Sequence, residues 1–299
     1  MKDYDVVVIG GSFAGQSAAM QLARARQDVL LVDAGLPRNR FAEESHGFLG
    51  QDGRAPSAII RTARCQLDAY PTATIKHGLV HSVEQEAEHF LVSLDTDDAV
   101  RARRMVLATG VSDELPQIPG LAERWGATVL HCPYCHGYEV RDQRLGVIAN
   151  HPLAAHQASL IPDWGPTILF TQGRFEPDEA QMALLGKRGV DIERTPVVEL
   201  VGEGPGLSGV RLADERFVEL GAIFTNPHTR ISSPIAERMG CALEDGPTGK
   251  FIRVDEWGLT SLDGVYAAGD AAMPMHNATL ASASGVRAGV AAHRSLATG

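Results

Sequence analysis

The chain has 299 residues, with 27 lysines and arginines against 37 aspartates and glutamates, so its formal net charge is −10. An acidic chain lacks the positive field that nucleic acid or an anionic membrane surface would require, so we expect neither as a partner. The length suffices for two domains with well-filled cores.

Neither export nor membrane insertion is predicted. Met1 to Asp5 leads directly into a short apolar run, without the basic start, long apolar stretch and cleavage site of a secretory signal. No apolar run approaches the roughly 20 residues that span a bilayer. Four cysteines are too few for a secreted disulfide scaffold of this length. We therefore expect a reducing cytoplasm, where a close cysteine pair more often does chemistry than holds a fold together.

The first 35 residues have the pattern of a βαβ unit. Residues 6–9 form a β-branched run typical of a buried parallel strand, and a glycine-containing turn follows at residues 10–15. Alanines, Met20 and Leu22 recur at helical spacing over residues 16–25. Residues 29–32 predict the second strand, which ends at an aspartate.

This unit predicts a dinucleotide site. Gly10 allows a tight turn, and Gly15 lets the helix pack close to the strand, so the helix N-terminus offers N–H groups to a pyrophosphate. Asp33 stands where a carboxylate accepts hydrogen bonds from ribose hydroxyls. Ser12 replaces the middle glycine of the usual fingerprint, and its hydroxyl could face the phosphate. The alternative is a structural βαβ unit without a ligand.

Further along the chain, strand and turn signals divide the sequence into two domains. A buried strand runs into a glycine turn at residues 106–110, and prolines then mark a domain crossing. A second strand–helix pattern begins at residues 145–148, and a strand with a Gly-Asp turn covers residues 264–270, followed by a helix over residues 277–296. We predict an α/β fold of two Rossmann-like, three-layer dinucleotide-binding domains, the second inserted into the first. The outer domain would comprise residues 1–113 and 236–299, and the inner domain residues 114–235.

The inner domain carries a cysteine pair. Cys132 and Cys135 stand three positions apart, so they share one face of a helical turn and can close a small disulfide ring. His136 follows directly, and its side chain, with an unperturbed pKa of about 6.5, is a plausible acid and base for thiol chemistry. A redox-active disulfide is therefore predicted.

A redox disulfide has three alternatives at this cysteine pair. A structural zinc site needs four ligands, usually two cysteine pairs, and the sequence has no second pair, so no metal is predicted. Cys-x-x-Cys-His is also the attachment signature of c-type haem, but that attachment needs export. Two buried structural cysteines are the third alternative.

Together these motifs resemble the low-molecular-weight thioredoxin reductase family over nearly the whole chain. The resemblance rests on residues 10–15, 107–110, 132–135 and 264–270. It implies a homodimer with FAD in the outer domain, and a thioredoxin-like protein or a small dithiol or disulfide as the partner. Cys135 would face the flavin, and Cys132 would attack the substrate. The family usually has aspartate where this chain has His136, which suggests different proton handling.

The resemblance also implies which residues contact FAD. Asp270 would bind the ribityl chain, Asn277 and Ala278 would lie beside the flavin ring, and the backbone of Val80 would contact adenine. Arg38 is about as well explained by a solvated loop as by a contact with the cofactor. The full set of expected FAD contacts is Gly10, Ser12, Phe13, Ala14, Gly15, Asp33, Ala34, Arg40, His46, Val80, Thr109, Gly110, Gly269, Asp270, Asn277 and Ala278.

The inner domain departs from the family at the NADPH site. Ala149 and His151 occupy the positions of two glycines where backbone must approach a pyrophosphate, and Pro152 removes an N–H donor. At most one arginine, Arg174, remains where a basic cluster would hold the 2′-phosphate. We therefore expect NADPH binding to be weak or lost, as in the reductase-like dithiol oxidases that reoxidise the flavin with oxygen. The alternatives are an NADPH-dependent thioredoxin reductase, a ferredoxin-linked disulfide reductase and a non-enzymatic flavoprotein.

Overall fold

The computed structural model describes residues 1–95 and 98–298, which divide into two compact units. The outer unit comprises residues 1–40, 57–112 and 229–299, and the inner unit comprises residues 41–56 and 113–228. The chain changes unit within strands β7 (Val111–Glu114) and β16 (His228–Ile231), which pair with each other. The sequence predicts these crossings after residues 113 and 235, with residues 41–56 in the outer domain, whereas the structure groups residues 41–56 with the inner unit.

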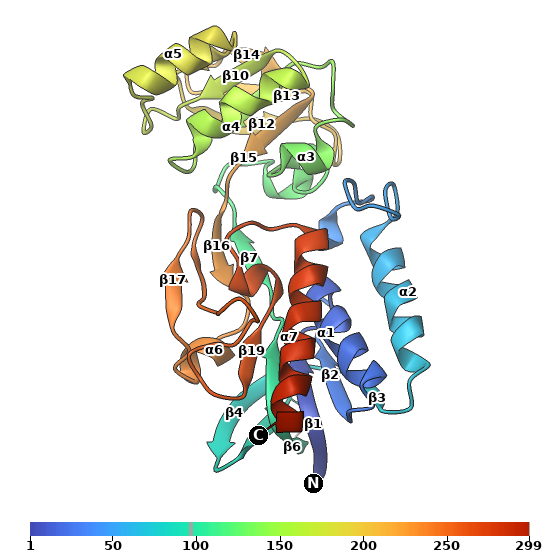
Figure 1. The fold of residues 1–299 in the computed structure, drawn as a ribbon. Coiled ribbons are helices and arrows are strands. Elements are labelled where there is room, and N and C mark those ends of the chain that lie inside the picture. The colour runs from blue at the N-terminus through green and yellow to red at the C-terminus, as the bar shows by residue number, and fades with distance from the viewer. Residues whose placement is uncertain (96–97, 299) are drawn as a thin grey trace. The chain divides into compact units, whose positions relative to one another are not determined.

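The outer unit is built on a sheet with the strand order β3-β2-β1-β6-β5-β4 (Figure 1). Strands β1, β2, β3 and β6 run parallel, β19 adds in parallel to the end of β6, and β4, β5 and β6 form an antiparallel meander. The strands of the outer unit are β1 (Lys2–Ile9), β2 (Val29–Asp33), β3 (Ala73–His77), β4 (Val80–Glu86), β5 (His89–Leu94), β6 (Ala99–Leu107) and β19 (Val265–Ala267), together with β17 (Leu243–Asp245) and β18 (Lys250–Ile252), which form a separate two-stranded sheet. Its helices are α1 (Phe13–Arg24), α2 (Pro56–Asp68), α6 (Ile235–Arg238) and α7 (Ala278–Thr298).

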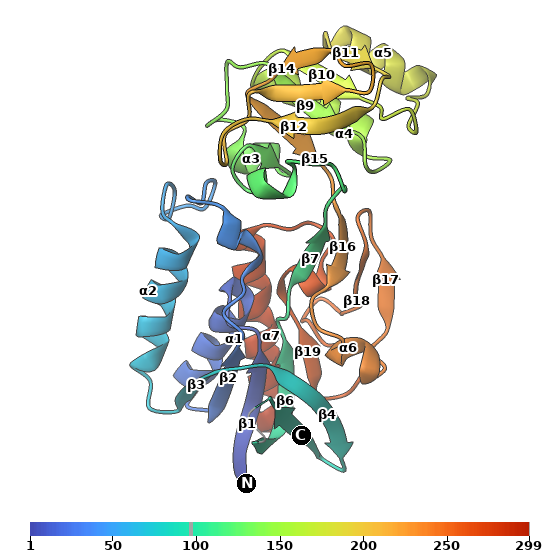
Figure 2. The same ribbon diagram turned by 180° about the vertical axis from the view of Figure 1, so that it is seen from behind.

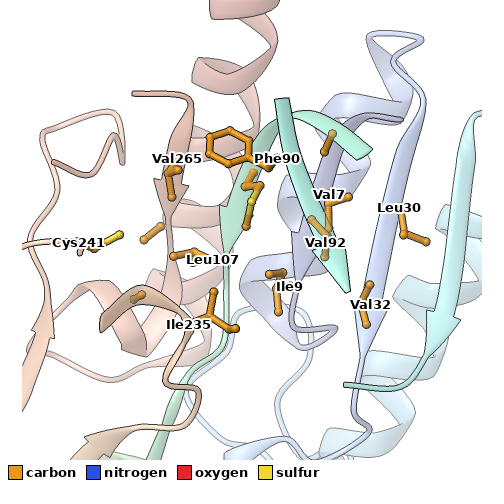
Figure 3. Packing of buried hydrophobic residues seen from close by; sticks show 14 of the residues in the cluster. Val7, Ile9, Leu30, Val32, Phe90, Val92, Leu107, Ile235, Cys241 and Val265 are labelled. Carbon is orange, nitrogen blue, oxygen red and sulfur yellow. The ribbon is translucent and has the colours of Figure 1, made fainter. Parts of the chain in front are cut away.

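Both faces of the parallel strands are buried, which explains their unbroken apolar sequence. Val6 and Val8 of β1 pack with residues of α1 and α7, whereas Val7 and Ile9 point to the opposite face. There they join a cluster that includes Phe90 of the meander (Figure 3). The first glycine turn therefore follows a rigid strand that is fixed from both sides.

The inner unit also has three layers, as Figure 2 shows. Its central sheet is parallel, in the order β11-β10-β9-β15-β8. Helices α4 and α5 pack on one face, and the antiparallel strands β12, β13 and β14 pack on the other. The strands are β8 (Val129–Leu130), β9 (Leu145–Ile148), β10 (Thr167–Phe170), β11 (Asp191–Glu193), β12 (Val197–Val201), β13 (Gly209–Leu212), β14 (Phe217–Glu219) and β15 (Ala222–Thr225), and the helices are α3 (Pro133–His136), α4 (Ala154–Leu160) and α5 (Glu179–Lys187).

The predicted α/β fold class is confirmed, and the strands expected at residues 6–9, 29–32 and 145–148 are present as β1, β2 and β9. The first helix begins at Phe13 rather than at residue 16, because the chain enters it directly from the turn. No helix within the described ranges combines the length and apolar composition that crossing a bilayer requires.

Candidate functional site

The turn between β1 and α1 brings backbone against backbone. Gly10 has a φ of +110°, and a Cβ at this position would overlap the carbonyl oxygen of Ala108. A Cβ on Gly15 would overlap the carbonyl oxygen of Gly10, so the start of α1 packs closely on the turn. Ser12 is the N-cap of α1. The first turn of the helix, at whose N-terminus a phosphate can bind, contains Phe13, Ala14 and Gly15.

Two polar side chains border this turn. The carboxylate of Asp33, at the end of β2, accepts the N–H of Gly35 at 2.9 Å and lies where a Cβ on Gly11 would overlap it. Thr109 follows β6, and its buried Oγ1 has no hydrogen-bond partner in the part of the chain that the structure describes. Buried hydroxyls normally have a hydrogen-bond partner, and a bound molecule would supply one for this atom. The close turn, the carboxylate and the unpaired hydroxyl fit the ribose and pyrophosphate of FAD. Ala34 and Gly110 adjoin these two residues.

Asp270 lies in the turn that follows β19. Its carboxylate accepts a hydrogen bond from Nη1 of Arg38 at 3.2 Å, and both side chains are more than four-fifths buried. The N–H of Gly269 donates to Oγ of Ser284 in α7 at 2.9 Å. The sequence left Arg38 undecided between loop and site, and nothing in the sequence pattern pointed to Ser284.

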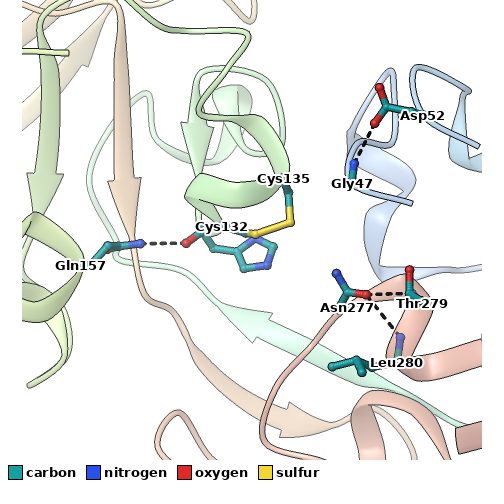
Figure 4. The surroundings of a disulfide bond; sticks show 9 residues. Gly47, Asp52, Cys132, Cys135, Gln157, Asn277, Thr279 and Leu280 are labelled. Carbon is teal, nitrogen blue, oxygen red and sulfur yellow. Dashed lines mark hydrogen bonds between the residues drawn. A yellow bond between two sulfur atoms is a disulfide. The ribbon is translucent and has the colours of Figure 1, made fainter. Parts of the chain in front are cut away.

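Asn277 is the residue before α7. Its Oδ1 accepts the N–H groups of Thr279 at 2.8 Å and Leu280 at 3.3 Å, as Figure 4 shows. Ala278 is the first residue of the helix. Asn277 thus fixes where α7 begins, and the placement of both residues beside a flavin ring stays a prediction.

Two of the expected FAD contacts lie at the margins of the outer unit. Arg40 is exposed, and its Nη1 donates to the carbonyl oxygen of Pro37 at 3.0 Å. Val80 begins β4, where it is partly buried and pairs with Leu94 of β5. Their contacts to a cofactor stay predictions.

Cys132 and Cys135 form a disulfide in the inner unit, with their Cα atoms 5.3 Å apart (Figure 4). Cys132 is the extended N-cap of the short helix α3, and Pro133 occupies its first position, where a missing N–H costs nothing. The N–H groups of Cys135 and His136 both point to the carbonyl oxygen of Cys132, at 3.2 and 3.3 Å. One helical turn therefore brings the two sulfurs together, as the spacing predicts.

A buried glutamine holds the segment that precedes the disulfide. Gln157 of α4 donates from Nε2 to the carbonyl oxygen of His131 at 2.7 Å, and its Oε1 accepts from Nδ2 of Asn226 at 3.2 Å. Its side chain thus links the residue before Cys132 to the end of β15.

Replacing Gln157 with alanine should lower the free energy of unfolding by about 1–3 kcal/mol, because it leaves buried polar groups without their partners. Urea unfolding of the holoprotein measures this loss. Gln117→Ala is the control, since Gln117 is exposed and donates to the nearby Leu115 carbonyl, and we expect a change within about 0.5 kcal/mol. Equal stability of the two variants would show that the Gln157 link contributes nothing.

His136 is the last residue of α3 and lies close to His46, with 6.3 Å between the ring centres. Burial lowers the pKa of the His136 imidazole, the carboxylate of Glu139 opposes this effect, and His46 adds to it. His46 was predicted as an FAD contact, and the structure places it in the inner unit through the loop of residues 41–56.

The carboxyl end of β9 is where a second dinucleotide would bind in a fold of this kind. Nδ1 of His151 accepts the N–H of Leu153 at 3.2 Å, and Pro152 has no N–H to donate. The rings of His151 and His228 lie 5.1 Å apart between centres. The N–H of Leu153 is therefore already bonded within the loop, and Pro152 has none. A pyrophosphate would need such N–H groups.

Carboxylates face the arginines near the ends of β10 and β11. Arg194 donates to both carboxylate oxygens of Glu176, at 2.5 and 3.1 Å. Arg216 donates to Glu193 at 2.7 Å, and this hydrogen bond lowers the pKa of Glu193 to about 2. Arg174 is exposed. Arg194 and Arg216 were not predicted in this region, and their charges are already matched by acidic neighbours.

A family model described as pyridine nucleotide-disulphide oxidoreductase matches residues 4–285. The chain belongs to this family. Thioredoxin reductase tcpT of Claviceps purpurea is 33% identical over 306 residues, which cover 98% of this chain and 94% of that protein. An oxidoreductase from Agrobacterium tumefaciens is 50% identical, with a TM-score of 0.94 and 99% of each chain covered. The crystal structure of HlmI is 41% identical, with a TM-score of 0.93, and covers 99% of this chain and 93% of that one.

The family model and the Claviceps relative confirm the predicted resemblance to thioredoxin reductases. This pyridine nucleotide-disulphide oxidoreductase is an FAD-dependent, thioredoxin reductase-like enzyme. The residues around Gly10, Asp33 and Thr109 would hold the FAD, and the redox role of the Cys132–Cys135 disulfide stays a prediction.

Proposed function

We propose that this enzyme oxidises a substrate dithiol through the Cys132–Cys135 disulfide and FAD, with oxygen as the final acceptor and without NADPH. The observation that supports this proposal most strongly is the state of the N–H groups at the carboxyl end of β9. There His151 takes the Leu153 N–H, and Pro152 supplies none. A pyrophosphate bound at this edge would have to displace a contact within the chain, and the neighbouring arginines are matched by carboxylates.

Thiol–disulfide exchange then accounts for the chemistry of the cysteines. One substrate thiolate attacks Sγ of Cys132, the bond to Cys135 breaks, and Cys135 leaves as a thiolate. The second substrate thiolate attacks the substrate sulfur of this mixed disulfide and displaces Cys132. The substrate has then lost two electrons as its own disulfide forms, and the two cysteines have gained them.

His136 handles the protons of this exchange. The substrate thiols must lose two protons to react, and the two cysteine sulfurs can take them up. A buried imidazole with a lowered pKa is neutral at physiological pH, so it can accept a thiol proton and return it to a leaving sulfur. When bound, FAD would supply the two-electron acceptor that the Cys132 and Cys135 thiols need to return to the disulfide, and oxygen would receive these electrons and yield hydrogen peroxide.

Oxygen uptake tests the proposal. With dithiothreitol as the probe dithiol, we expect the holoenzyme to consume about one oxygen and form about one hydrogen peroxide per dithiol oxidised, since both are two-electron steps. Adding NADPH should leave the rate unchanged. Oxygen uptake that required NADPH would reject the proposal.

The second candidate function is an NADPH-dependent thioredoxin-disulfide reductase. The name of the Claviceps relative favours it, and its substrate would be a thioredoxin-like protein rather than a small dithiol. Steady oxidation of NADPH in the presence of a thioredoxin disulfide would select this function. The homodimer and the cytoplasmic location expected from the sequence stay predictions, and sedimentation of the holoprotein tests the first.

A further inference from the structure

The loop of residues 41–56 brings a second histidine into the inner unit. It is separated in sequence from the rest of that unit, yet it groups with it, and its Gly47 lies near the backbone of Tyr134 in α3. His46 of this loop has a side chain that is only 16% exposed. A solvated loop does not explain why this imidazole is largely buried beside α3.

Three carboxylates surround the His46 ring. Nε2 lies 3.5 Å from Oε2 of Glu44 and 3.5 Å from Oε1 of Glu139, and Nδ1 lies 3.7 Å from Oδ1 of Asp52. Asp52 is itself held, because the same oxygen accepts the N–H of Gly47 at 2.8 Å (Figure 4). Both ring nitrogens thus face carboxylate oxygens, and the ring is held between acidic side chains of the loop and Glu139.

Glu139 connects this cluster to His136. It stands three residues after His136 in the chain, contacts His46, and raises the pKa of His136, whereas His46 lowers it. Within the inner unit, Glu139 from the segment after α3 and His46 from the loop are the titratable neighbours that shift the pKa of His136. The two influences oppose each other, so the pair Glu139–His46 determines how much negative charge His136 experiences.

We propose that His46 is a positioning residue for His136: it pairs with Glu139 and so leaves the neighbouring His136 imidazole able to take the proton of an incoming thiol. This inference rests on the proposed dithiol chemistry. His46 touches neither substrate nor sulfur in this role. It acts through the carboxylate that it shares with His136, and Glu44 and Asp52 hold its ring in place.

Opposite substitutions should move the titration of His136 in opposite directions. His46→Gln leaves Glu139 uncompensated, so the midpoint of the His136 titration should rise. Glu139→Gln removes the carboxylate and leaves His46, so the midpoint should fall, and the double variant should lie between them. The control is His156→Gln, because His156 is an exposed histidine on α4.

Proton NMR of the imidazole C–H in the oxidised holoprotein measures these midpoints, with the His136 signal assigned by its loss in His136→Gln. The second readout is the rate at which dithiothreitol bleaches the flavin without oxygen. His46→Gln should lose rate at about pH 6.5 and recover it at about pH 9, because a base with a raised pKa is protonated over a wider acidic range.

The two readouts separate the possible failures. The role of His46 would be overturned if the midpoint of the His136 titration were unchanged in His46→Gln and Glu139→Gln, or if it moved in the same direction in both. If dithiothreitol failed to bleach the wild-type flavin at any pH, the proposed function would fail, and the NMR titration would still decide whether His46 and Glu139 control His136.

Discussion

Replacing Cys135 with serine should leave a yellow protein whose flavin no longer bleaches when a dithiol is added. Without Cys135 there is no disulfide for a substrate thiolate to attack, and the remaining Cys132 thiol, already reduced, cannot accept electrons from a dithiol. We expect the rate of flavin reduction by dithiothreitol to fall by about 10³-fold or more, the scale on which enzymes lose rate without a covalent catalytic group. Stopped-flow absorbance under anaerobic conditions measures this rate.

Cys65→Ser is the matched control, since Cys65 is an exposed free thiol on α2 in the outer unit. We expect dithiothreitol to reduce the flavin of this variant at the wild-type rate. A Cys135→Ser protein that kept more than a tenth of that rate would mean that the dithiol reduces the flavin directly, and the cysteine pair would lose its place in the mechanism.

The second large effect is expected at the first glycine turn. Gly10→Val should yield a colourless protein, because the side chain would overlap the Ala108 carbonyl and a φ of +110° is strained for any residue with a Cβ. The backbone would have to shift where a pyrophosphate must lie against it. We expect a loss of about 2 kcal/mol or more in the free energy of unfolding, together with loss of bound flavin.

Gly186→Ala separates this effect from the general cost of replacing glycine. Gly186 lies in α5 of the inner unit, and a Cβ there meets nothing within 4 Å. Alanine favours a helix over glycine, so this variant should be as stable as the wild type or slightly more so. Flavin content by absorbance and urea unfolding of both variants would test the prediction. A Gly10→Val protein with full flavin content would show that the dinucleotide lies elsewhere.

The elements that could be predicted from sequence are those whose contacts are local. The β1–α1–β2 unit is set by an apolar run, a glycine turn and helical spacing within 35 residues, and the Cys132–Cys135 ring closes within one helical turn. The antiparallel strands β12, β13 and β14 were not predicted. They are short, and their alternation is weak beside the strongly apolar parallel strands.

Side chains that meet across long stretches of sequence could not be found in this way. Arg38 reaches Asp270 more than two hundred residues away, and Gln157 holds the carbonyl of His131 from another helix. His46 was expected at the FAD because the motif resemblance covers its loop, whereas its contacts with Glu139 and His136 depend on how that loop packs. A single sequence shows which residues could react but not which of them share a carboxylate.

Anaerobic mixing of the oxidised holoenzyme with either reductant tests the central claim most directly. We predict that dithiothreitol bleaches the flavin within seconds, that NADPH at micromolar concentration leaves it oxidised, and that oxygen then restores the colour of the bleached sample. Rapid bleaching by NADPH, or a flavin that stays oxidised in dithiothreitol, would contradict the account.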